Sequence, residues 1–242
     1  MEMGDSLHNG KPYSQFSYDK HARTCDPADF LGQVLRTVNG IQLQDNQLEM
    51  IIEAIRSKLS LNSNDVLLEL ACGNGMLSRL LFDSCYQYLG TDISEYLISI
   101  AIKNFQVSPN YQFLEIGAAD YVRKEPSPKR FTKALCYAGF QYFNSRDVRG
   151  ILRLLFEKFT NIEKIYIGNI PDKERSKKFY LEKQPSEEEL LDCCTAIGRW
   201  YTRSEFEKLA NRVGWKVEFS IMPDEFYASY YRFDALLSRQ ND

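Results

Sequence analysis

The amino-acid sequence predicts an α/β fold: a doubly wound, mostly parallel seven-stranded sheet with helices on both faces and a C-terminal antiparallel hairpin. Two observations carry this prediction. Short apolar segments, typical of strands buried on both faces of a parallel sheet, alternate five times with helical segments. Two further strand-like segments then follow at 216–222 and 230–238, which predicts a hairpin at one edge of the sheet.

Length and composition limit the number of domains and the class of partner. The chain has 242 residues, of which 44% are hydrophobic and 26% charged; this suits one globular domain or a domain with an added cap. With 30 Lys and Arg against 33 Asp and Glu, the formal net charge is −3. A protein that grips phosphate backbones normally needs a concentrated positive surface. The basic clusters at 123–130 and 173–178 are short and mixed with acids, so nucleic acid is a disfavoured partner.

No apolar run is long enough to cross a membrane, and residues 1–21 lack the apolar core of a signal peptide. We therefore expect a soluble, cytoplasmic protein without a membrane partner. The six cysteines show no Cys-x-x-Cys spacing, and the chain has two histidines. We expect reduced structural thiols and no metal. The sequence does not indicate the oligomeric state.

Residues 1–44 differ in character from the rest of the chain. They are polar, rich in aromatic side chains and weakly periodic. We expect an N-terminal arm or lid that folds over a site and does not join the sheet. The main domain is expected over residues 45–242.

Clear periodicity begins with a helix predicted at 45–59, for which Asp45 or Asn46 is placed as a cap. Its apolar residues share one face: Leu48, Ile51, Ile52, Ile55 and Leu59. The apolar run 65–70 predicts the first strand. A loop with two glycines follows it and leads into a helix that we expect to end near Phe82.

The remaining elements alternate along the chain. Strands are predicted at 86–93, 111–116, 131–138 and 164–170, before the hairpin. Helices are predicted at 94–105 with Ser94 as N-cap, and at 145–159, 186–194 and 202–214. A proline-rich turn lies at 125–129, and the segment 171–185 is charged and irregular.

The most informative segment is the glycine loop that follows the first strand. In such sheets, ligands bind beyond the carboxyl ends of the strands, near the point where strand order reverses. Gly73 and Gly75 lack a Cβ, so the backbone can turn tightly and approach a ligand closely. Asp92 ends the second strand, close to the roughly 20-residue offset at which a carboxylate accepts hydrogen bonds from ribose hydroxyls. The alternative for Asp92 is a helix cap, a role that Ser94 can already fill.

Two ligand classes use this geometry. A dinucleotide site needs a third glycine, and the chain has Ser78 at that position. Glu69, four residues before Gly73, suits a carboxylate that receives an ammonium group or orders the loop. A ligand with a sulfonium, an amine and an adenosine, but no pyrophosphate, therefore fits better than a dinucleotide.

The loop sequence ELACGNG at 69–75 resembles the E/D-x-G-x-G-x-G loop of class I S-adenosylmethionine-dependent methyltransferases. The sequence LGTDIS at 89–94 is similar to the second motif of that family. The resemblance runs from Asp45 to the C-terminus and includes the closing hairpin. It departs from the family at Ala71, in place of the first glycine, and at 116–117, where the family often has an acidic residue after the third strand.

The resemblance implies S-adenosylmethionine as cofactor and a methyltransferase of the small-molecule type. It leaves the adenine contact open: Asp120 follows the departure, and two alanines leave room for the base. The cofactor-binding residues that it implies, with Tyr137 at the tip of the fourth strand, are Glu69, Ala71, Gly73, Asn74, Gly75, Asp92, Ile93, Ala118 and Ala119.

The tip of the fourth strand, CYAGFQYFN at 136–144, is expected to crowd the mouth of the site. DNA, rRNA and glutamine-modifying methyltransferases carry an Asn/Asp-Pro-Pro-aromatic box here, which this chain lacks; this argues against an exocyclic base amine as acceptor. We expect Phe140, Gln141, Tyr142 and Asn169 to bind the acceptor. For Phe140 and for Phe143, packing in the core is an equal alternative.

The arm sequence at 13–27 resembles the lid of small-molecule methyltransferases, including sugar-amine N-methylating ones. Tyr18 and His21 are the catalytic candidates on this resemblance, and Tyr18 is expected to bind substrate as well. An imidazole can take a proton near neutral pH, although a solvated arm residue is the alternative for His21. Arg175 and its neighbouring lysines could pair with an anionic group, but a solvated charged helix is the favoured reading.

The leading hypothesis is an enzyme that moves a methyl group to an oxygen or nitrogen atom of a small polar acceptor, such as a sugar or a biosynthetic intermediate. The first alternative is an RNA methyltransferase, and the second a pseudo-enzyme that binds the cofactor without turnover. An NAD-linked oxidoreductase is a distant further reading, because Ser78 and Glu69 count against it. Arsenic methylation at Cys193 and Cys194 is disfavoured, because the spaced partner cysteines of that family are missing.

Overall fold

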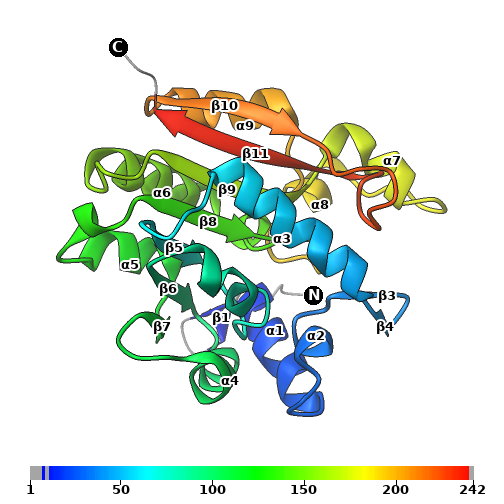
Figure 1. Ribbon diagram of the computed structural model, residues 1–242. Coiled ribbons are helices and arrows are strands. Elements are labelled where there is room, and N and C mark those ends of the chain that lie inside the picture. Colours follow the sequence, from blue (N-terminus) through cyan, green and yellow to red (C-terminus); the bar gives the residue numbers. More distant parts are fainter. Residues whose placement is uncertain (1–6, 9–10, 240–242) are drawn as a thin grey trace.

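The computed structural model describes residues 7–8 and 11–239 and centres on a seven-stranded sheet of order β10-β11-β9-β8-β5-β6-β7 (Figure 1). Five neighbouring strands are parallel: β5 (Val66–Leu70), β6 (Gln87–Asp92), β7 (Tyr111–Glu115), β8 (Lys133–Tyr137) and β9 (Lys164–Pro171). Strand β11 (Arg232–Arg239) runs antiparallel to β9 and to the edge strand β10 (Trp215–Ser220). The predicted fold class is confirmed.

Strand order reverses at β5. The chain runs from β5 outward to β6 and β7, then returns to place β8 and β9 on the other side. The carboxyl ends of the central strands border a crevice at such a reversal. The residues that follow β5, β6, β8 and β9 are therefore brought together, although they are far apart in sequence.

Helices cover both faces of the sheet (Figure 1). One apolar layer contains α3 (Asp45–Leu59), the 3₁₀ helix η1 (Ser78–Ser84) and α4 (Glu95–Phe105). The other contains α5 (Ala118–Lys124), α6 (Ser145–Glu157) and α9 (Arg203–Asn211). Side-chain alternation along β5 supplies both layers, since Leu67 joins the first and Leu68 and Leu70 join the second.

Most predicted elements are present, with boundaries moved by a few residues. Helix α3 buries the five predicted apolar residues, and Ser94 caps α4 by accepting a hydrogen bond from the Leu97 N–H at 3.2 Å. Helix α5 was missed by the sequence analysis. It is one of the shorter helices and starts at Gly117, which offers no side-chain cap, but it is held to the sheet by buried Tyr121 and Val122. The glycine loop leads into a 3₁₀ helix and not an α-helix.

Three short helices occupy or border the stretch predicted as irregular: η4 (Lys173–Arg175), α7 (Ser176–Phe179) and α8 (Glu187–Leu191). Shorter still are η2 (Pro128–Arg130) and η3 (Phe140–Tyr142). They connect the main elements and keep the loops beyond β8 and β9 compact.

The N-terminal arm is more regular than its weak periodicity predicts. It contains α1 (Tyr13–Thr24), α2 (Phe30–Gln33) and two small strand pairs, β1 (Leu7–His8) with β2 (Lys11–Pro12) and β3 (Thr37–Val38) with β4 (Ile41–Gln42). These strands pair with each other and not with the main sheet. Helix α1 is stabilised by contact with α4, which a local sequence pattern cannot reveal.

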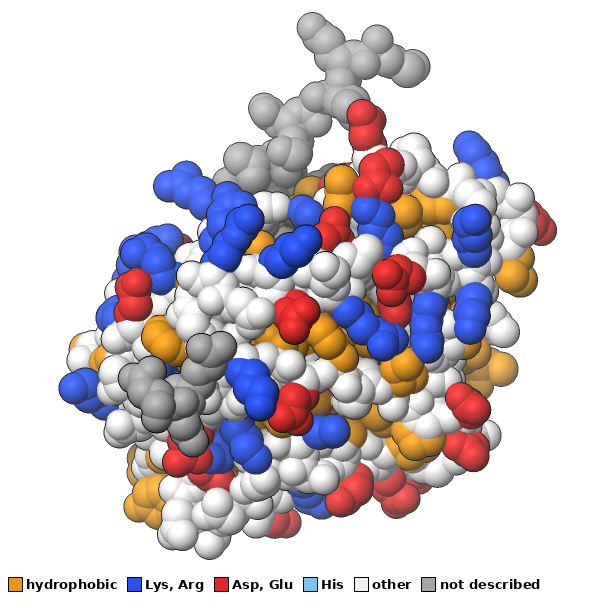
Figure 2. Space-filling view, turned by 90° about the horizontal axis from the view of Figure 1, so that it is seen from above, with side chains coloured by type: hydrophobic (Ala, Val, Ile, Leu, Met, Phe, Trp, Pro, Cys, Tyr) orange, Lys and Arg blue, Asp and Glu red, His pale blue; other side chains and the backbone are white. Residues whose placement is uncertain are grey.

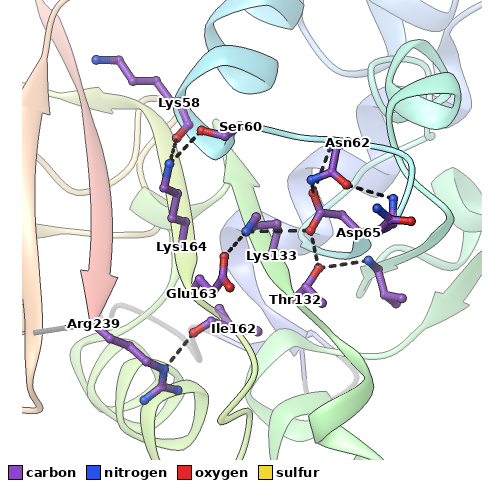
Figure 3. Close-up of polar contacts among 12 residues, drawn as sticks. Lys58, Ser60, Asn62, Asp65, Thr132, Lys133, Ile162, Glu163, Lys164 and Arg239 are labelled. Carbon is purple, nitrogen blue, oxygen red and sulfur yellow. Dashed lines mark hydrogen bonds and ion pairs between the residues drawn. The ribbon is translucent and has the colours of Figure 1, made fainter. Parts of the chain in front are cut away.

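A polar network ties the amino ends of the central strands together (Figure 3). Asp65 accepts hydrogen bonds from the Asn62 N–H at 3.0 Å and from the Thr132 hydroxyl at 2.7 Å. Lys133, which is almost fully buried, lies 3.8 Å from Asp65 and also pairs with Glu163. This network lies at the amino ends of the strands, opposite the crevice, so we assign it a structural role.

Within the part of the chain that the structure describes, no helix is long and apolar enough to span a membrane. The six cysteines are free thiols. Asp192, Cys193 and Cys194 hold three potential metal ligand atoms within 4.8 Å of one another. They are consecutive in one turn, in which Asp192 accepts a hydrogen bond from the Cys194 N–H at 2.8 Å, and they lie outside the crevice.

Candidate active site

A cavity of about 410 Å³ lies at the carboxyl ends of β5, β6, β8 and β9. Its walls come from the glycine loop, the end of β6, the start of α5 and the segment after β8. Further wall comes from the 34–37 segment of the arm and from the residues around the start of β11. Ligand pockets commonly measure about 300–1,000 Å³. The crevice predicted from the strand reversal therefore contains a cavity of small-ligand size.

Three strand tips turn into the cavity through left-handed backbone. Ala71 after β5, Ala138 after β8 and Asn169 near the end of β9 have φ angles of 60°, 60° and 63°. A residue with a Cβ adopts this conformation at a cost of about 1–2 kcal/mol. Strained backbone at three neighbouring tips is typical of a functional site, where the loops must present backbone groups to a ligand.

Asp92 is hydrogen-bonded to the glycine loop. Its carboxylate accepts hydrogen bonds from the Gly73 N–H and from the Ser94 N–H, both at 2.9 Å. Burial raises the pKa of Asp92, although the hydrogen bonds from the backbone N–H groups of Ser94, Gly73 and Ile93 act in the opposite direction. A carboxylate has about four lone-pair sites, so Asp92, which lines the cavity, can still accept hydrogen bonds from a ligand.

Glu69 lies beneath the loop and does not line the cavity. It is buried, and one carboxylate oxygen accepts hydrogen bonds from the Ser78 hydroxyl at 2.6 Å and the Tyr88 hydroxyl at 2.7 Å. Of the two predicted roles, the geometry favours ordering the loop over receiving an ammonium group. It also explains Ser78, whose hydroxyl occupies the position of the missing third glycine.

Gly75 likewise faces the protein and not the cavity. A Cβ at Gly75 would lie 2.7 Å from the ring of Phe113, and the φ angle of Gly75 is 74°. Among the other predicted cofactor residues, Ala71, Gly73, Asn74, Asp92, Ile93, Ala118 and Tyr137 line the cavity. Ala119 does not; it lines a separate groove between α5, α6 and α9.

The arm is fastened to the site at two points. The Asn74 side-chain amide of the glycine loop donates to the Phe30 carbonyl at 2.8 Å and to the Gln33 side chain at 2.9 Å. Asp19 of α1 accepts a hydrogen bond from the Ser94 hydroxyl at 2.6 Å, at the start of α4. Burial by itself raises the pKa of Asp19, but hydrogen bonds from Ser94 and from the arm outweigh it and lower that pKa overall.

Tyr18 lines the cavity, and its hydroxyl is hydrogen-bonded to that of Tyr142. Its hydroxyl lies 2.6 Å from the Tyr142 hydroxyl, and Tyr142 in turn donates to the Ala196 carbonyl at 2.8 Å. Because Tyr142 has a single proton, Tyr18 is the donor between the two rings. Burial raises the pKa of Tyr18 well above its ordinary value of 10.0, so its hydroxyl stays protonated near neutral pH and cannot serve as a phenolate base.

His21 does not point into the cavity, contrary to its predicted place beside the acceptor. Its Nε2 lies 2.9 Å from the Gly32 carbonyl, so the ring joins α1 to α2 within the arm. Phe140 is also absent from the wall: it is buried and packs against Phe143, Tyr201 and Phe206. For Phe140, the core alternative describes its position.

The predicted acceptor residues Gln141, Tyr142 and Asn169 all line the cavity. Several buried polar atoms on this wall have no hydrogen-bond partner: the Tyr137 hydroxyl, Gln141 Oε1, Asn169 Oδ1 and Arg232 Nε. Buried polar groups are paired in the great majority of cases. Four unpaired groups around one cavity therefore indicate that a polar ligand completes their bonding, which fits an adenosyl sulfonium compound and an acceptor side by side.

The sequence analysis missed Arg36 and Arg232, both on the cavity wall. Neither belongs to a recognisable motif. Arg36 lies in the arm and Arg232 opens an edge-side strand, so only the folded chain brings them to the site. Arg175, weighed earlier as an anion partner, instead pairs with Asp172 at 3.6 Å and donates to the Ser229 carbonyl at 3.0 Å.

The segments that follow β5 and β8 are so close that an added methyl group would clash. A Cβ at Gly139 would lie 2.5 Å from the Ala71 Cβ. We expect Gly139→Ala to lower the free energy of unfolding by about 1–3 kcal/mol, because it overpacks this contact. Ala71→Gly alone is expected to stabilise by about 1 kcal/mol through relief of the left-handed φ.

The double variant tests the contact itself. Combining Ala71→Gly with Gly139→Ala should restore most of the lost stability, since the methyl group at 71 is gone. Urea denaturation of the four proteins of this cycle measures the coupling. Additive effects of the two substitutions would contradict the predicted contact.

Comparisons with known proteins agree with this geometry. Residues 67–158 match the family model described as a methyltransferase domain. The chain is 31% identical over 80 residues to a malonyl-[acyl-carrier protein] O-methyltransferase of Halalkalibacterium halodurans. The match covers 32% of this chain and spans about a third of the length of that relative, at 30%.

Two solved structures share the fold. A magnesium protoporphyrin IX methyltransferase from Synechocystis with bound S-adenosylmethionine gives a TM-score of 0.57 at 12% identity, over 93% of this chain and 91% of that one. A small RNA methyltransferase, HEN1, gives 0.59 at 17% identity, over 83% of this chain and 26% of that one. These likenesses concern the fold. In its matched domain and in its fold, the chain is similar to class I S-adenosylmethionine-dependent methyltransferases, whose cofactor is S-adenosylmethionine.

Proposed function

We propose that the protein transfers a methyl group from S-adenosylmethionine to an oxygen or nitrogen atom of a small polar acceptor, such as a sugar or a biosynthetic intermediate. The observation that carries the proposal is the cavity of about 410 Å³, which the glycine loop and a group of tyrosines border together: Tyr18, Tyr142, Tyr227 and Tyr231. The N-terminal arm, residues 1–44, would act as the lid of this space, because Tyr18 and the 34–37 segment form part of its wall.

The cofactor roles follow from position. Asp92 would accept hydrogen bonds from the ribose hydroxyls, while Ile93 and Ala118 would border the adenine. Ala71, Gly73 and Asn74 would present the loop to the methionyl part, and the unpaired Tyr137 hydroxyl would lie at that end. Glu69 and Gly75 would support the loop from behind.

When bound, the cofactor supplies an electrophilic methyl group whose transfer leaves a neutral thioether. The chain's own residues then have to orient the acceptor and exclude water. Tyr18, Tyr142, Gln141 and Asn169 are placed to orient it. Burial raises the pKa of Tyr142 as well as that of Tyr18, so both hydroxyls position the acceptor as neutral groups.

The named relatives do not fix the acceptor, because they act on an acyl-carrier protein derivative, a porphyrin and a small RNA. RNA is a second candidate, favoured by one observation. The groove between α5, α6 and α9 has a volume of about 540 Å³ and is lined by Arg123, Arg146, Arg149, Arg153 and Arg212. On the face shown in Figure 2, Lys and Arg side chains are interspersed with Asp and Glu.

One experiment separates the candidates. Purified protein is incubated with isotopically labelled S-adenosylmethionine and, in parallel, with a metabolite extract or with total RNA. We expect label in a small metabolite, found by mass spectrometry, and a higher melting temperature with S-adenosylhomocysteine but not with NAD. Label in RNA would support the second candidate. Cofactor binding without any transfer would support the pseudo-enzyme, and no thermal shift with either cofactor form would contradict the proposal.

A further inference from the structure

Arg232 is a buried cation without an anionic partner. It is the first residue of β11, its exposed fraction is 9%, and it lines the cavity. Its Nη1 donates to the Asn169 carbonyl at 2.6 Å, and its guanidinium lies 4.7 Å from the centre of the Tyr231 ring. Its Nε has no hydrogen-bond partner. Among residues 18–239, no carboxylate lies within ion-pair distance of Arg232.

This arrangement is unusual because burying an unpaired charge is strongly unfavourable. The buried Lys133, by contrast, is paired with Asp65 and Glu163. Asp234 is two residues away on the same strand, but its Oδ1 is engaged by the Asn169 N–H at 2.7 Å. An anionic occupant of the cavity would supply the close ion pair that Arg232 lacks.

The rest of the wall supports an anionic occupant. The cavity is lined by two arginines, Arg36 and Arg232, and by one carboxylate, that of Asp92. Both oxygens of Asp92 already accept hydrogen bonds from backbone N–H groups, one from Gly73 of the glycine loop and one from Ser94 at the start of α4. The wall thus has an excess of positive charge, which favours an oxyanion.

The two arginines serve different ends of the cavity. Arg36 lies 5.3 Å from the centre of the Tyr137 ring, at the end assigned to the methionyl part of the cofactor. That part carries its own carboxylate, which Arg36 can take. Arg232 lies beside Asn169 and Tyr231, and it interacts electrostatically with Tyr142 and Tyr227 on the cavity wall. It is therefore left for the acceptor.

We propose that Arg232 binds an oxyanion of the methyl acceptor, a carboxylate or a phosphate, so that the enzyme selects acidic acceptors. The inference rests on the proposed function and narrows its substrate class. A guanidinium offers two parallel N–H groups, which suit both anions. The aromatic rings around it, Tyr142, Tyr227 and Tyr231, suit a planar or apolar body attached to that anion.

Calorimetry on the full chain tests the proposal in two steps. S-adenosylhomocysteine is titrated first, and four probes are then titrated into the saturated protein: benzoate, phenyl phosphate, benzamide and benzylamine. We expect the wild-type protein to bind benzoate or phenyl phosphate at least about tenfold more tightly than benzamide, with benzylamine weakest. Preference for benzoate would identify a carboxylate acceptor, and preference for phenyl phosphate a phosphate acceptor.

Variants assign the effect to Arg232. Arg232→Met should weaken binding of the preferred anion about 10- to 100-fold, while binding of benzamide and of S-adenosylhomocysteine stays within about twofold. Arg232→Lys keeps the charge and should give an intermediate loss. Arg130→Met is the matched control, since Arg130 is exposed on η2, lines neither the cavity nor the arginine-lined groove, and its loss should leave all titrations unchanged.

Several results would overturn the proposal. Equal affinity of the wild-type protein for benzoate, phenyl phosphate and benzamide would do so even if Arg232→Met failed to fold. An unchanged anion affinity in Arg232→Lys and Arg232→Met would also do so. Loss of S-adenosylhomocysteine binding in Arg232→Met equal to the loss of anion binding would assign this arginine to the cofactor. A wild-type protein that fails to bind S-adenosylhomocysteine but still prefers anions would contradict the proposed function and leave only an anion site at Arg232.

Discussion

Replacing Asp92 by alanine is expected to weaken the binding of S-adenosylhomocysteine by about 100-fold or more. Asp92 lines the cavity at the end of β6 and is proposed to accept both ribose hydroxyls. Hydrogen bonds to a charged group each contribute about 1.5–3 kcal/mol, and a factor of ten corresponds to about 1.4 kcal/mol. The substitution also frees the Gly73 N–H, which now donates to Asp92 at 2.9 Å, so the loop loses its support.

Isothermal titration calorimetry measures this loss. Asp92→Asn keeps the shape and one acceptor, so an intermediate affinity is expected. Asp120→Ala is the control, because Asp120 is an exposed carboxylate on α5 that pairs with Arg123 and does not line the cavity. Unchanged affinity in Asp92→Ala, in a protein that keeps its melting temperature, would remove the ribose assignment.

Replacing Glu69 by alanine is expected to lower the free energy of unfolding by about 3–4 kcal/mol. Ser78 and Tyr88 are almost fully buried and donate to the Glu69 carboxylate, so both hydroxyls would lose their partner. Each buried group left without a partner costs about 1–3 kcal/mol, and the cavity left by the side chain adds to this. Urea denaturation measures the change. Glu157→Ala, on the exposed face of α6, should change stability by less than about 0.5 kcal/mol.

The pH dependence of Glu69→Gln checks the same cluster. Burial raises the pKa of Glu69 above its ordinary value of 4.5, although the hydrogen bonds from Ser78 and Tyr88 act against this rise. The folded protein thus binds this proton more tightly than the unfolded chain does. The resulting stabilisation is fully present below about pH 4.5 and is lost as the pH rises through the raised pKa. Wild-type protein should therefore lose stability relative to Glu69→Gln as the pH increases, and a growing advantage would contradict the cluster.

The sequence predicted those parts of the molecule whose pattern is local. Helix α3 repeats its apolar residues along one face, and the five parallel strands are short apolar runs, so both follow from period and length alone. The glycine loop and Asp92 follow from a spacing that the strand order brings together. The positions of Ala71, Gly73 and Asp92 on the cavity wall agree with that prediction.

Other parts depend on contacts between distant segments. Neither α1 nor α5 has a strong sequence pattern of its own, because each depends on contacts with distant segments. Asp19 connects α1 to α4, and Tyr121 and Val122 pack α5 against the sheet. Arg232 is one of two arginines in β11, and only the fold shows that its Nε lacks a hydrogen-bond partner. For His21, the sequence placed the residue in the correct segment but could not indicate that its ring turns toward the Gly32 carbonyl.

The two fastenings of the arm have a thermodynamic consequence. Asn74 connects the arm to the glycine loop, and Asp19 connects it to the start of α4, directly after Asp92. The same two segments thus contact the arm through side chains and also line the cavity. By linkage, whatever free energy an occupant gains from a docked arm, the docked arm gains equally from the occupant. Ligand binding and docking of the arm are therefore coupled. A substitution that weakens docking of the arm also weakens ligand binding, even when it lies far from any ligand atom.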